Sequence, residues 1–412
     1  MSAASVDLAV AEAAEQPLAP AAKTKRPGAI VTLRQLAHRA KVPVNSFVHL
    51  TSRCNLPCMH CYQVRDGTNG GHQVGYGPDM DTPTVMRTLD QLAQMGSLMV
   101  TLTGGEALLR RDFDRIVAYA RRLGFIVRLF TNGVLVDDVM ADRIQKAAPH
   151  EVHISVYGVT AETHETVTCA PGSFVKTRRA VEILRARGLP VKVKCVVMTV
   201  NFHEWRALRA WADSLGCTYA FDATLTARED GDTFPKQLRI SDEQLREINA
   251  ELAADDIDRQ ARSWYDWLDR SEAEQTEFAS ESVCGACSTT VAIVGDGRVR
   301  SCQLMHVDAG SVTEQPLPEI WEGSAWFHKV RSVTLTALRE CRTCPDLPFC
   351  ERCGAMALQE DGDLLGPSAE SCRKAAARRA VWESLHPAKA RERLTVGTDG
   401  RMSRSEREGV DR

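Results

Sequence analysis

The 412-residue sequence has no excess charge of either sign and no long hydrophobic run. Its 51 basic residues nearly balance 54 acidic ones, so bulk charge gives no reason to expect a nucleic acid or an anionic membrane as partner. No segment approaches the roughly 20 apolar residues of a membrane-spanning helix. Asp7 and Glu12 lie where a secretory signal peptide carries basic and then apolar residues. We therefore expect a cytoplasmic protein without a membrane or nucleic-acid partner.

Cysteine is the residue that the sequence has in excess. The hydrophobic fraction of 44% and the charged fraction of 25% are ordinary for a globular protein, but the chain contains 14 cysteines. A reducing cytoplasm does not maintain disulfides, and a chain of this length does not need them to fold. The clustered cysteines therefore indicate metal ligation or redox chemistry.

The order of apolar segments predicts an α/β fold. Short apolar runs alternate with amphipathic helical patterns between residues 45 and 223, which is typical of βα units that build a parallel sheet. A complete eight-unit barrel needs about 250 residues, so we expect a partial (β/α)6 TIM-like barrel over residues 29–225, with ligands at the carboxyl ends of its strands. The six expected strands are 45–50, 98–102, 125–130, 151–156, 191–198 and 218–222.

Other parts of the chain have a different composition. Residues 1–28 contain almost no large apolar side chains and are predicted to form a disordered tail. Residues 226–283 read as an acidic helical bridge, in which Trp264, Tyr265 and Trp267 are expected to be packing residues. A small Cys-rich α+β iron–sulfur domain is expected over 284–375. Residues 376–412 are expected to form a C-terminal helix and a charged tail.

Three cysteines follow the first predicted strand in a C-x3-C-x2-C pattern: Cys54, Cys58 and Cys61. A structural zinc site is closed by four ligands, whereas three closely spaced thiolates suit a 4Fe-4S cluster with one iron left open. A zinc loop with His60 as fourth ligand is the alternative. The pattern at this position resembles the signature of the radical S-adenosylmethionine (SAM) enzymes, and the resemblance covers residues 47–223.

The resemblance implies a cofactor and a reaction. In that family the fourth iron binds the amino and carboxylate groups of SAM, and an electron from the reduced cluster cleaves the sulfonium to release a 5'-deoxyadenosyl radical. Gly104, Gly105 and Glu106 follow the second predicted strand and are similar to the family's GGE motif. The glycines allow the backbone to approach a ligand closely, and the carboxylate can accept hydrogen bonds from the SAM ammonium.

Four further residues are expected near SAM from their positions. Asn132 and Ser155 close the third and fourth strands, where the family places polar groups near the ribose and the methionine carboxylate. Asn201 follows the fifth strand and could instead cap the next helix. Tyr62 is adjacent to Cys61 and is expected to pack on the adenine. An ordinary strand-end serine and a core tyrosine are the alternatives for Ser155 and Tyr62.

A second group of eight cysteines lies in fewer than one hundred residues: Cys284, Cys287, Cys302, Cys341, Cys344, Cys350, Cys353 and Cys372. Eight thiolates would complete two 4Fe-4S clusters, although two zinc sites would also use them. The Gly297-x4-Cys302 pattern, followed by C-x2-C-x5-C, resembles the SPASM extension of some radical SAM enzymes. By that analogy, one cluster is held by Cys284, Cys287, Cys302 and Cys353, and the other by Cys341, Cys344, Cys350 and Cys372. Three clusters are therefore expected in all.

A turn and three remaining cysteines complete the candidate residues. Gly295-Asp296-Gly297 predicts a hairpin that brings Cys287 and Cys302 together. Cys195 and Cys217 lie in or beside predicted strands and are expected to be small core residues. Cys169 lies after the fourth strand and is a candidate substrate contact.

The SPASM resemblance implies a peptide or protein substrate. The leading hypothesis is a radical SAM maturase that modifies a side chain or α-carbon of a ribosomally made peptide, served by an electron donor such as flavodoxin or ferredoxin and by a possible separate peptide-recognition protein. Haem-pathway tetrapyrrole chemistry is an alternative. A sulfatase-maturing activity is a second, but Gln303 follows Cys302 where that group carries a carboxylate base. A zinc-binding structural protein is the alternative that is not an enzyme.

Overall fold

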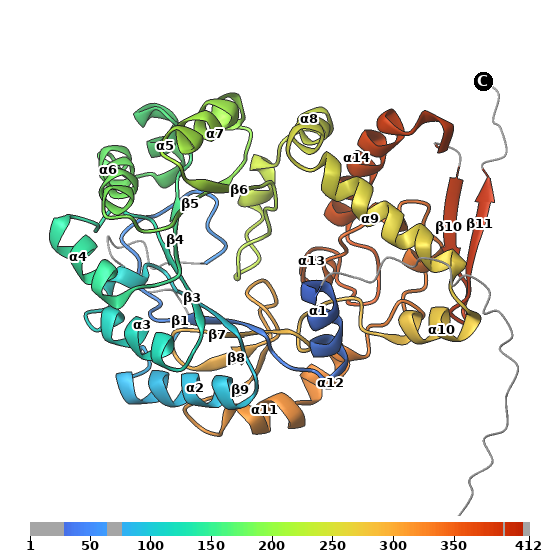
Figure 1. The fold of residues 1–412 in the computed structure, drawn as a ribbon, viewed down its shortest axis with the longest axis horizontal. Helices are drawn as coiled ribbons and strands as arrows, with labels where there is room; N and C mark the ends of the chain where they lie inside the picture. The colour runs from blue at the N-terminus through green and yellow to red at the C-terminus, as the bar shows by residue number, and fades with distance from the viewer. Residues whose placement is uncertain (1–28, 64–75, 390–391, 407–412) are drawn as a thin grey trace, which may run out of the picture.

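The computed structural model describes residues 29–63, 76–389 and 392–406, and the predicted tail of residues 1–28 lies outside them. A curved sheet of nine strands, in the order β6-β5-β4-β3-β2-β1-β7-β8-β9, forms the larger part (Figure 1). All neighbours from β1 to β6 pair in parallel, which confirms the predicted partial barrel. These strands are β1 Asn45–His49, β2 Met99–Thr103, β3 Ile126–Thr131, β4 Glu151–Ser155, β5 Val191–Val196 and β6 Thr218–Asp222.

Helices cover the outer face of the parallel strands (Figure 1). Leu89, Ile116 and Ile144 on these helices are fully buried, as are Leu129 and Ile154 on the strands. The other residues of β3 and β5 alternate with the buried ones and face the barrel interior, because successive side chains of a strand point to opposite faces. The helices are α2 Thr82–Gln94, α3 Phe113–Arg122, α4 Asp138–Ala147, α5 Ala161–Thr168, α6 Ser173–Ala186 and α7 Trp205–Ser214.

The predicted hairpin at Gly295–Gly297 is present and extends the barrel sheet. It joins β7, Thr290–Ile293, to β8, Arg298–Arg300, and β9, Asp308–Ser311, follows. Strand β7 pairs in parallel with the free edge of β1, so the first Cys-rich segment continues the barrel instead of forming a separate sheet. Gly297 has φ of +92°, a backbone conformation that glycine adopts without strain. Helices α11 Leu317–Gly323 and α12 Ala325–Arg331 come next.

The remaining helices lie on the other side of the molecule (Figure 1). The expected helical bridge contains α8 Asp242–Leu252, α9 Ala254–Asp266 and α10 Glu272–Ser280, and α1 Ala29–Arg39 contacts it through an Arg39–Glu281 ion pair of 2.6 Å. Its aromatic residues pack as predicted, since Trp267 stacks on Phe278 at 4.3 Å between ring centroids. Helices α13 Gly354–Glu360 and α14 Ala369–Leu385 complete this side, and Cys372 lies on α14.

The prediction of a charged tail after the last helix was wrong for residues 392–406. Strands β10 Glu392–Val396 and β11 Met402–Glu406 form an antiparallel hairpin. Leu394 and Val396 are fully buried and pack against the aromatic residues of the bridge. The apolar side chains alternate with polar ones along β10, and that pattern was masked by the high charge of the segment.

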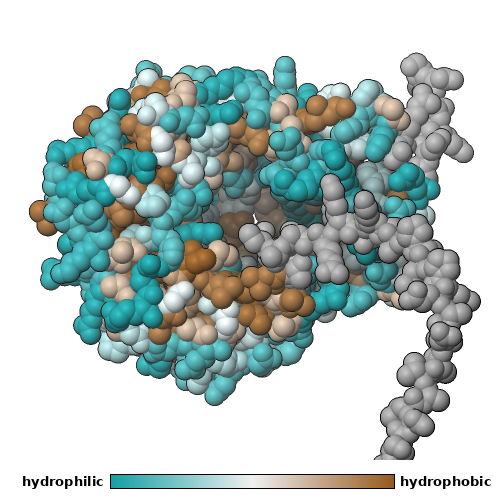
Figure 2. Space-filling model, viewed as in Figure 1, coloured by the Kyte–Doolittle hydropathy of each residue, from teal (hydrophilic) through white to brown (hydrophobic). Residues whose placement is uncertain are grey.

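A hollow opens at the centre of the molecule between the barrel and the α8–α14 side (Figure 2). The Cys54 loop follows the carboxyl end of β1, as described below. Within the described ranges no helix is both long enough and apolar enough to cross a membrane.

Candidate radical SAM active site

The loop with Cys54, Cys58 and Cys61 is held rigidly at the carboxyl end of β1. Asp79 accepts hydrogen bonds from the Thr51 hydroxyl at 2.6 Å and from the Ser52 backbone N–H at 2.8 Å. The guanidinium of buried Arg110 donates to the backbone oxygens of Leu50 at 2.9 Å and Met80 at 2.7 Å. Sequence reasoning missed Asp79 and Arg110, because their partners come from distant segments.

Gly104 and Gly105 allow the end of β2 to lie directly against this loop. A Cβ atom on Gly104 would lie 2.4 Å from the Thr51 backbone oxygen, and one on Gly105 would lie 2.1 Å from that of Arg53. Gly105 N–H donates to the Thr51 oxygen at 2.9 Å, and Glu106 N–H donates to the Arg53 oxygen at 2.8 Å. The sequence-based reason for these glycines was close approach to a ligand, but in the structure the approaching group is the cysteine loop itself.

The Glu106 carboxylate joins the ends of β2 and β3. It is 1% exposed and accepts hydrogen bonds from Thr131 Oγ1 at 2.8 Å and from the Asn132 N–H at 2.7 Å. The Asn132 side chain donates to Asn55 Oδ1 at 2.7 Å, which ties the end of β3 to the cysteine loop. Glu106 therefore holds the end of β3 against the end of β2 by hydrogen bonds within the protein. Its contact with the SAM ammonium stays a prediction.

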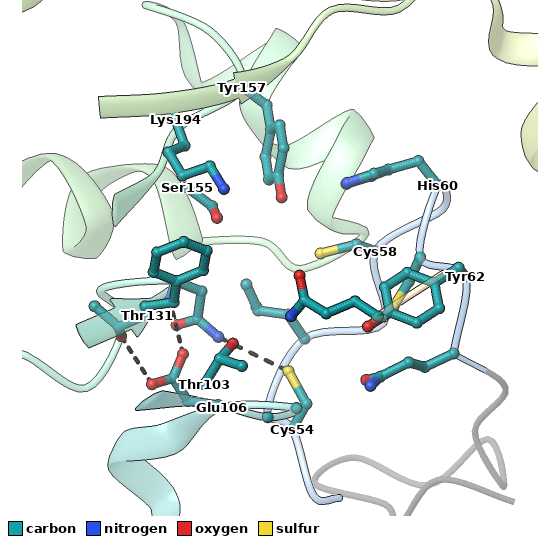
Figure 3. A pocket seen from close by; sticks show the side chains of 18 residues that line it. Cys54, Cys58, His60, Tyr62, Thr103, Glu106, Thr131, Ser155, Tyr157 and Lys194 are labelled. Atoms are coloured by element: carbon teal, nitrogen blue, oxygen red, sulfur yellow. Dashed lines mark hydrogen bonds between the residues drawn. The ribbon is translucent and has the colours of Figure 1, made fainter. Parts of the chain in front are cut away.

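A cavity of about 260 Å³ lies between the cysteine loop and the ends of β2 to β5. Figure 3 shows Cys54 on one side of it, Ser155, Tyr157 and Lys194 on the opposite side, and Cys58 between them. Ten residues considered in the sequence analysis line this cavity: Cys54, Cys58, His60, Cys61, Tyr62, Gly104, Gly105, Glu106, Asn132 and Ser155.

Asn201 does not line the cavity. Its side chain accepts a hydrogen bond from Met198 N–H at 2.7 Å and donates to the Val196 oxygen at 3.0 Å. These bonds close the loop after β5 and stop the strand two residues before its predicted end. The side chain makes no helix-capping bond either, so the structure supports neither of the two roles considered for Asn201.

Burial controls the protonation of the groups around the cavity. It lowers the pKa of His60 to about 4, so this imidazole is neutral near pH 7, and its Nδ1 atom has no hydrogen-bond partner among the described residues. Burial also raises the pKa of Tyr62 and Tyr157 above the usual phenol value. The Tyr62 ring stacks on His306 at 5.6 Å between centroids, which holds it beside Cys61.

Eight further lining residues were missed by the sequence analysis as site residues, among them Phe130, Tyr157, Lys194 and Gln303. For Lys194 a signal was present, because Lys192 and Lys194 alternate with apolar residues in a strand whose other face is buried. Gln303 had been considered only as a departure from the sulfatase-maturing pattern. Its place in the cavity brings the residue after Cys302 to the carboxyl ends of the barrel strands.

Cys302 lies close to the other cysteines of its predicted group. Burial raises its pKa to about 12, and the neighbouring Cys284 and Cys353 thiolates act in the same direction. Burial also raises the pKa of Cys284, and the nearby Cys353 thiolate raises it further. Burial raises the pKa of Cys287 to about 12, with a smaller contribution from the Cys284 thiolate. The structure thus brings together four thiols that come from a turn, a hairpin and the start of α13.

The second predicted group lines a separate apolar pocket of about 90 Å³, formed by Cys341, Cys344, Cys350 and Cys372 with neighbouring side chains such as Leu347. Burial raises the pKa of Cys350 to about 12, and the other three thiolates add to the shift. Cys353 separates Cys350 from Cys372 in sequence but belongs spatially to the first group. The thiols thus lie in the same two sets of four that the resemblance implies, and their assignment to clusters stays a prediction.

The donor atoms in all three places are thiols, which are the ligands that iron–sulfur clusters take. Within the described ranges, no three His, Cys, Asp or Glu side chains are close enough to hold a single metal ion. Cys195 and Cys217 are buried, as expected for core residues. Cys169 is exposed at the end of α5 and does not line the cavity.

Comparison with known proteins identifies the class. Residues 48–212 match the family model of the Radical SAM superfamily, so the chain is a radical SAM enzyme. Residues 284–345 match the SPASM family model, an iron–sulfur cluster-binding domain, which makes it a radical SAM enzyme of the SPASM type. Its cofactors are 4Fe-4S clusters and SAM. A purely structural zinc protein does not fit this assignment.

Two kinds of characterised relative are similar over most of the chain. An AdoMet-dependent heme synthase of Methanosarcina barkeri is 28% identical over 329 residues, which are 77% of this chain and 92% of that protein. A PqqA peptide cyclase of Xanthomonas euvesicatoria is 29% identical over 366 residues, which are 85% of this chain and 94% of that protein.

Solved structures share the fold at low sequence identity. The enzyme anSMEcpe with bound AdoMet superposes with a TM-score of 0.61 at 16% identity, covering 84% of this chain and 95% of that one. Streptococcus suis SuiB bound to its precursor peptide SuiA gives a TM-score of 0.61 at 15% identity, covering 87% of this chain and 84% of that one. At these identities the likeness concerns the fold.

Proposed function

We propose that this enzyme is a peptide maturase that modifies a side chain or α-carbon of a ribosomally made peptide or protein. The observation that carries the proposal is the cavity shared by the Cys54 loop and Gln303, because it joins the SAM site to the region of the first auxiliary cluster. Similarity to PqqA peptide cyclases over 85% of the chain supports the substrate class.

The residues of this chain have separate tasks in the proposal. Cys54, Cys58 and Cys61 hold the SAM-binding cluster, and when SAM is bound it supplies the radical that abstracts a substrate hydrogen. Gly104, Gly105 and Glu106 position the cysteine loop against β2 and β3. Tyr62, Asn132 and Ser155 line the space for the adenosyl and methionyl groups. For Asn201 we propose only a structural role in the loop after β5.

We assign the two groups of four thiols to two auxiliary 4Fe-4S clusters. Cys284, Cys287, Cys302 and Cys353 would hold the cluster nearer the substrate, since Gln303 lines the cavity. Cys341, Cys344, Cys350 and Cys372 would hold the second one, on the side of α14. We divide the chain functionally into the core at 29–225, the bridge at 226–283, the auxiliary region at 284–375 and the C-terminal segment.

The proposal includes partners and a compartment. Reduction of the clusters needs a low-potential donor such as flavodoxin or ferredoxin. Recognition of the substrate peptide would use the bridge, the C-terminal helix or a separate recognition protein. The cysteine-rich composition and the chemistry of reduced clusters fit the cytoplasm.

Haem-pathway chemistry is the second candidate, because several similar proteins are AdoMet-dependent heme synthases. A sulfatase-maturing activity is less suited to this cavity. Gln303 occupies the place where that activity needs a carboxylate base, and an amide cannot take up a proton.

The test uses anaerobically reconstituted enzyme. We expect about twelve irons per chain, falling to about eight in the Cys54/Cys58/Cys61→Ala triple variant with loss of 5'-deoxyadenosine formation. Incubation with short peptides encoded beside the gene should give a mass change that requires SAM. A spectral titration with a porphyrin distinguishes haem-pathway chemistry, the second candidate function, from peptide modification. Porphyrin binding together with no peptide modification would contradict the peptide proposal in favour of tetrapyrrole chemistry.

A further inference from the structure

Arg331 is a buried arginine without a carboxylate partner. It is the last residue of α12, and it is 9% exposed. Its Nε–H donates to the backbone oxygen of Cys287 at 2.6 Å, whereas the buried Nη1 and Nη2 atoms have no hydrogen-bond partner among the described residues. Within the same ranges, Glu322 attracts it only from beyond ion-pairing distance. A buried charge without a partner is costly, so this arrangement indicates an anion that the polypeptide itself does not supply.

Aromatic rings hold the Arg331 guanidinium in place. Its central carbon lies 4.7 Å from the ring centroid of Trp321 and 5.9 Å from that of Phe327. Such contacts offset part of the cost of burial but do not neutralise the charge. Arg300, another buried arginine near the auxiliary cysteines, is paired in the ordinary way, since its Nε atom lies 2.7 Å from Asp308. The missing carboxylate is therefore a property of Arg331 and not of the whole region.

The turn at Cys287 is fixed by its neighbours. Cys287 is fully buried and has φ of +59°, a left-handed conformation that is uncommon for residues other than glycine. The hydrogen bond from Arg331 to its backbone oxygen stabilises this turn. Ser301, also fully buried, makes a side-chain hydrogen bond to the Cys287 thiol.

Trp326 determines the direction of the Ser301 hydroxyl. The Trp326 Nε1–H group donates to Ser301 Oγ at 3.1 Å. An indole can only donate, and a serine has a single hydroxyl hydrogen, so this hydrogen is left for the Cys287 sulfur. Cys287 is thus contacted by a hydrogen-bond donor at its sulfur and by a buried cation at its backbone.

We propose that Arg331 is the buried counter-cation of the first auxiliary cluster and that Ser301 is a hydrogen-bond donor to its ligand Cys287. Trp326 is a positioning residue, because it orients the Ser301 hydroxyl. The inference rests on the proposed assignment of Cys287 and the three thiols around it to one cluster, but not on a peptide substrate.

The expected consequence is a raised reduction potential of this cluster. Four thiolates outweigh the charge of a 4Fe-4S core, so the complete group is anionic, and the electron taken up on reduction adds one more negative charge. No proton is transferred, since the guanidinium and the hydroxyl keep their hydrogens. A nearby cation and a hydrogen bond to a ligand sulfur stabilise the reduced state more than the oxidised state.

The test is an EPR-monitored redox titration of the reconstituted holoenzyme. Added SAM identifies the signal of the SAM-binding cluster, since that cluster has the open iron. Arg331→Met should make the midpoint potential of one of the two other clusters more negative, by roughly tenfold in the ratio of reduced to oxidised cluster or about 59 mV. Arg331→Lys should keep most of the wild-type value. Lys329→Met removes an exposed charge from the same helix and should leave all midpoints unchanged.

Two further variants test the hydrogen bond and leave the arginine in place. Ser301→Ala removes the donor and should move the same midpoint in the same direction by a smaller amount. Trp326→Phe keeps an aromatic ring but removes the N–H group, so it should produce part of the Ser301→Ala shift. The double variant should shift no further than Ser301→Ala alone, because the indole acts through the hydroxyl.

The iron content separates the outcomes. About eight irons in the wild type instead of about twelve would overturn the cluster assignment and the inference with it. Full iron content with unchanged midpoints in Arg331→Met overturns the inference alone. Loss of about four irons in Arg331→Met but not in Arg331→Lys supports it, because the charge is then needed to keep the cluster.

If both Arg331 variants lose the cluster, the Ser301→Ala midpoint decides. A shift to more negative potential supports the proposal, and an unchanged midpoint overturns it. None of these measurements uses a peptide, so a failure of the proposed peptide-maturase function would be detected separately.

Discussion

Replacement of Gly105 by alanine is predicted to disconnect the cysteine loop from the barrel. The added Cβ atom would lie 2.1 Å from the Arg53 oxygen and 3.0 Å from Cys54 Cβ, and Cβ atoms essentially never approach other atoms closer than 3.0 Å. The loop would therefore have to move by roughly 1 Å, at a cost of about 1–3 kcal/mol of overpacking. Metal-ligand distances tolerate only about 0.2 Å, so this shift should impair the SAM-binding cluster more than the fold.

The measurement is iron and acid-labile sulfide per chain after reconstitution, together with the thermal unfolding midpoint. Gly105→Ala should lose about four of about twelve irons, the content of one 4Fe-4S cluster, and should form little 5'-deoxyadenosine. Gly323→Ala is the matched control, since nothing lies within 4 Å of its added Cβ at the end of α11. A Gly105→Ala enzyme with full iron content and normal SAM cleavage would refute the steric argument.

Three further predictions concern the charge and protonation of buried groups. Glu106→Gln should lower the free energy of unfolding by about 1–3 kcal/mol, as measured by thermal unfolding. Thr131 and the Asn132 N–H donate to different oxygens of the carboxylate, whereas an amide has only one oxygen. Burial lowers the pKa of His49 to about 4, so the unfolded chain binds a proton at this residue more readily than the folded protein does. The stability is therefore full above pH 6.5 and falls toward pH 4. Because His49→Phe removes this proton uptake, it should reduce the fall in the thermal unfolding midpoint between pH 7 and pH 5. The Arg352 guanidinium lies beside Cys341, one of the four thiols assigned to the second auxiliary cluster. Arg352→Gln removes this positive charge and should make the reduction potential of that cluster more negative in an EPR-monitored titration. An unchanged potential would contradict this placement.

The barrel and the position of the cysteine loop were predictable because their signals are local. Each of the six parallel strands is a short apolar run followed by an amphipathic helix, and this order of elements determines a parallel sheet. The spacing of Cys54, Cys58 and Cys61 just after the first strand then places three thiols at the carboxyl end of the sheet. Glu106 follows the neighbouring strand, so its proximity to the loop follows from the same rule.

Features that depend on contacts between distant segments required the tertiary structure. The sequence does not show that Cys353 joins Cys284 and Cys302 while Cys350 joins Cys372, because the grouping depends on how α13 and α14 pack. A family resemblance could suggest it, but spacing could not. The hairpin after α14 was missed for a similar reason, since its strands are stabilised by the aromatic residues of the bridge.

The chemical class was thus determined by the sequence, and the organisation of the site was decided by the fold. Residue types and their spacing along the chain fix which metals and cofactors can bind, because ligand chemistry is a property of individual side chains. Whether Gly105 contacts a ligand or the cysteine loop, and whether Lys192 forms an ion pair, depends on which backbone and which carboxylate lie opposite. Those neighbours are brought together only when distant segments pack in the folded protein, so no local pattern could identify them.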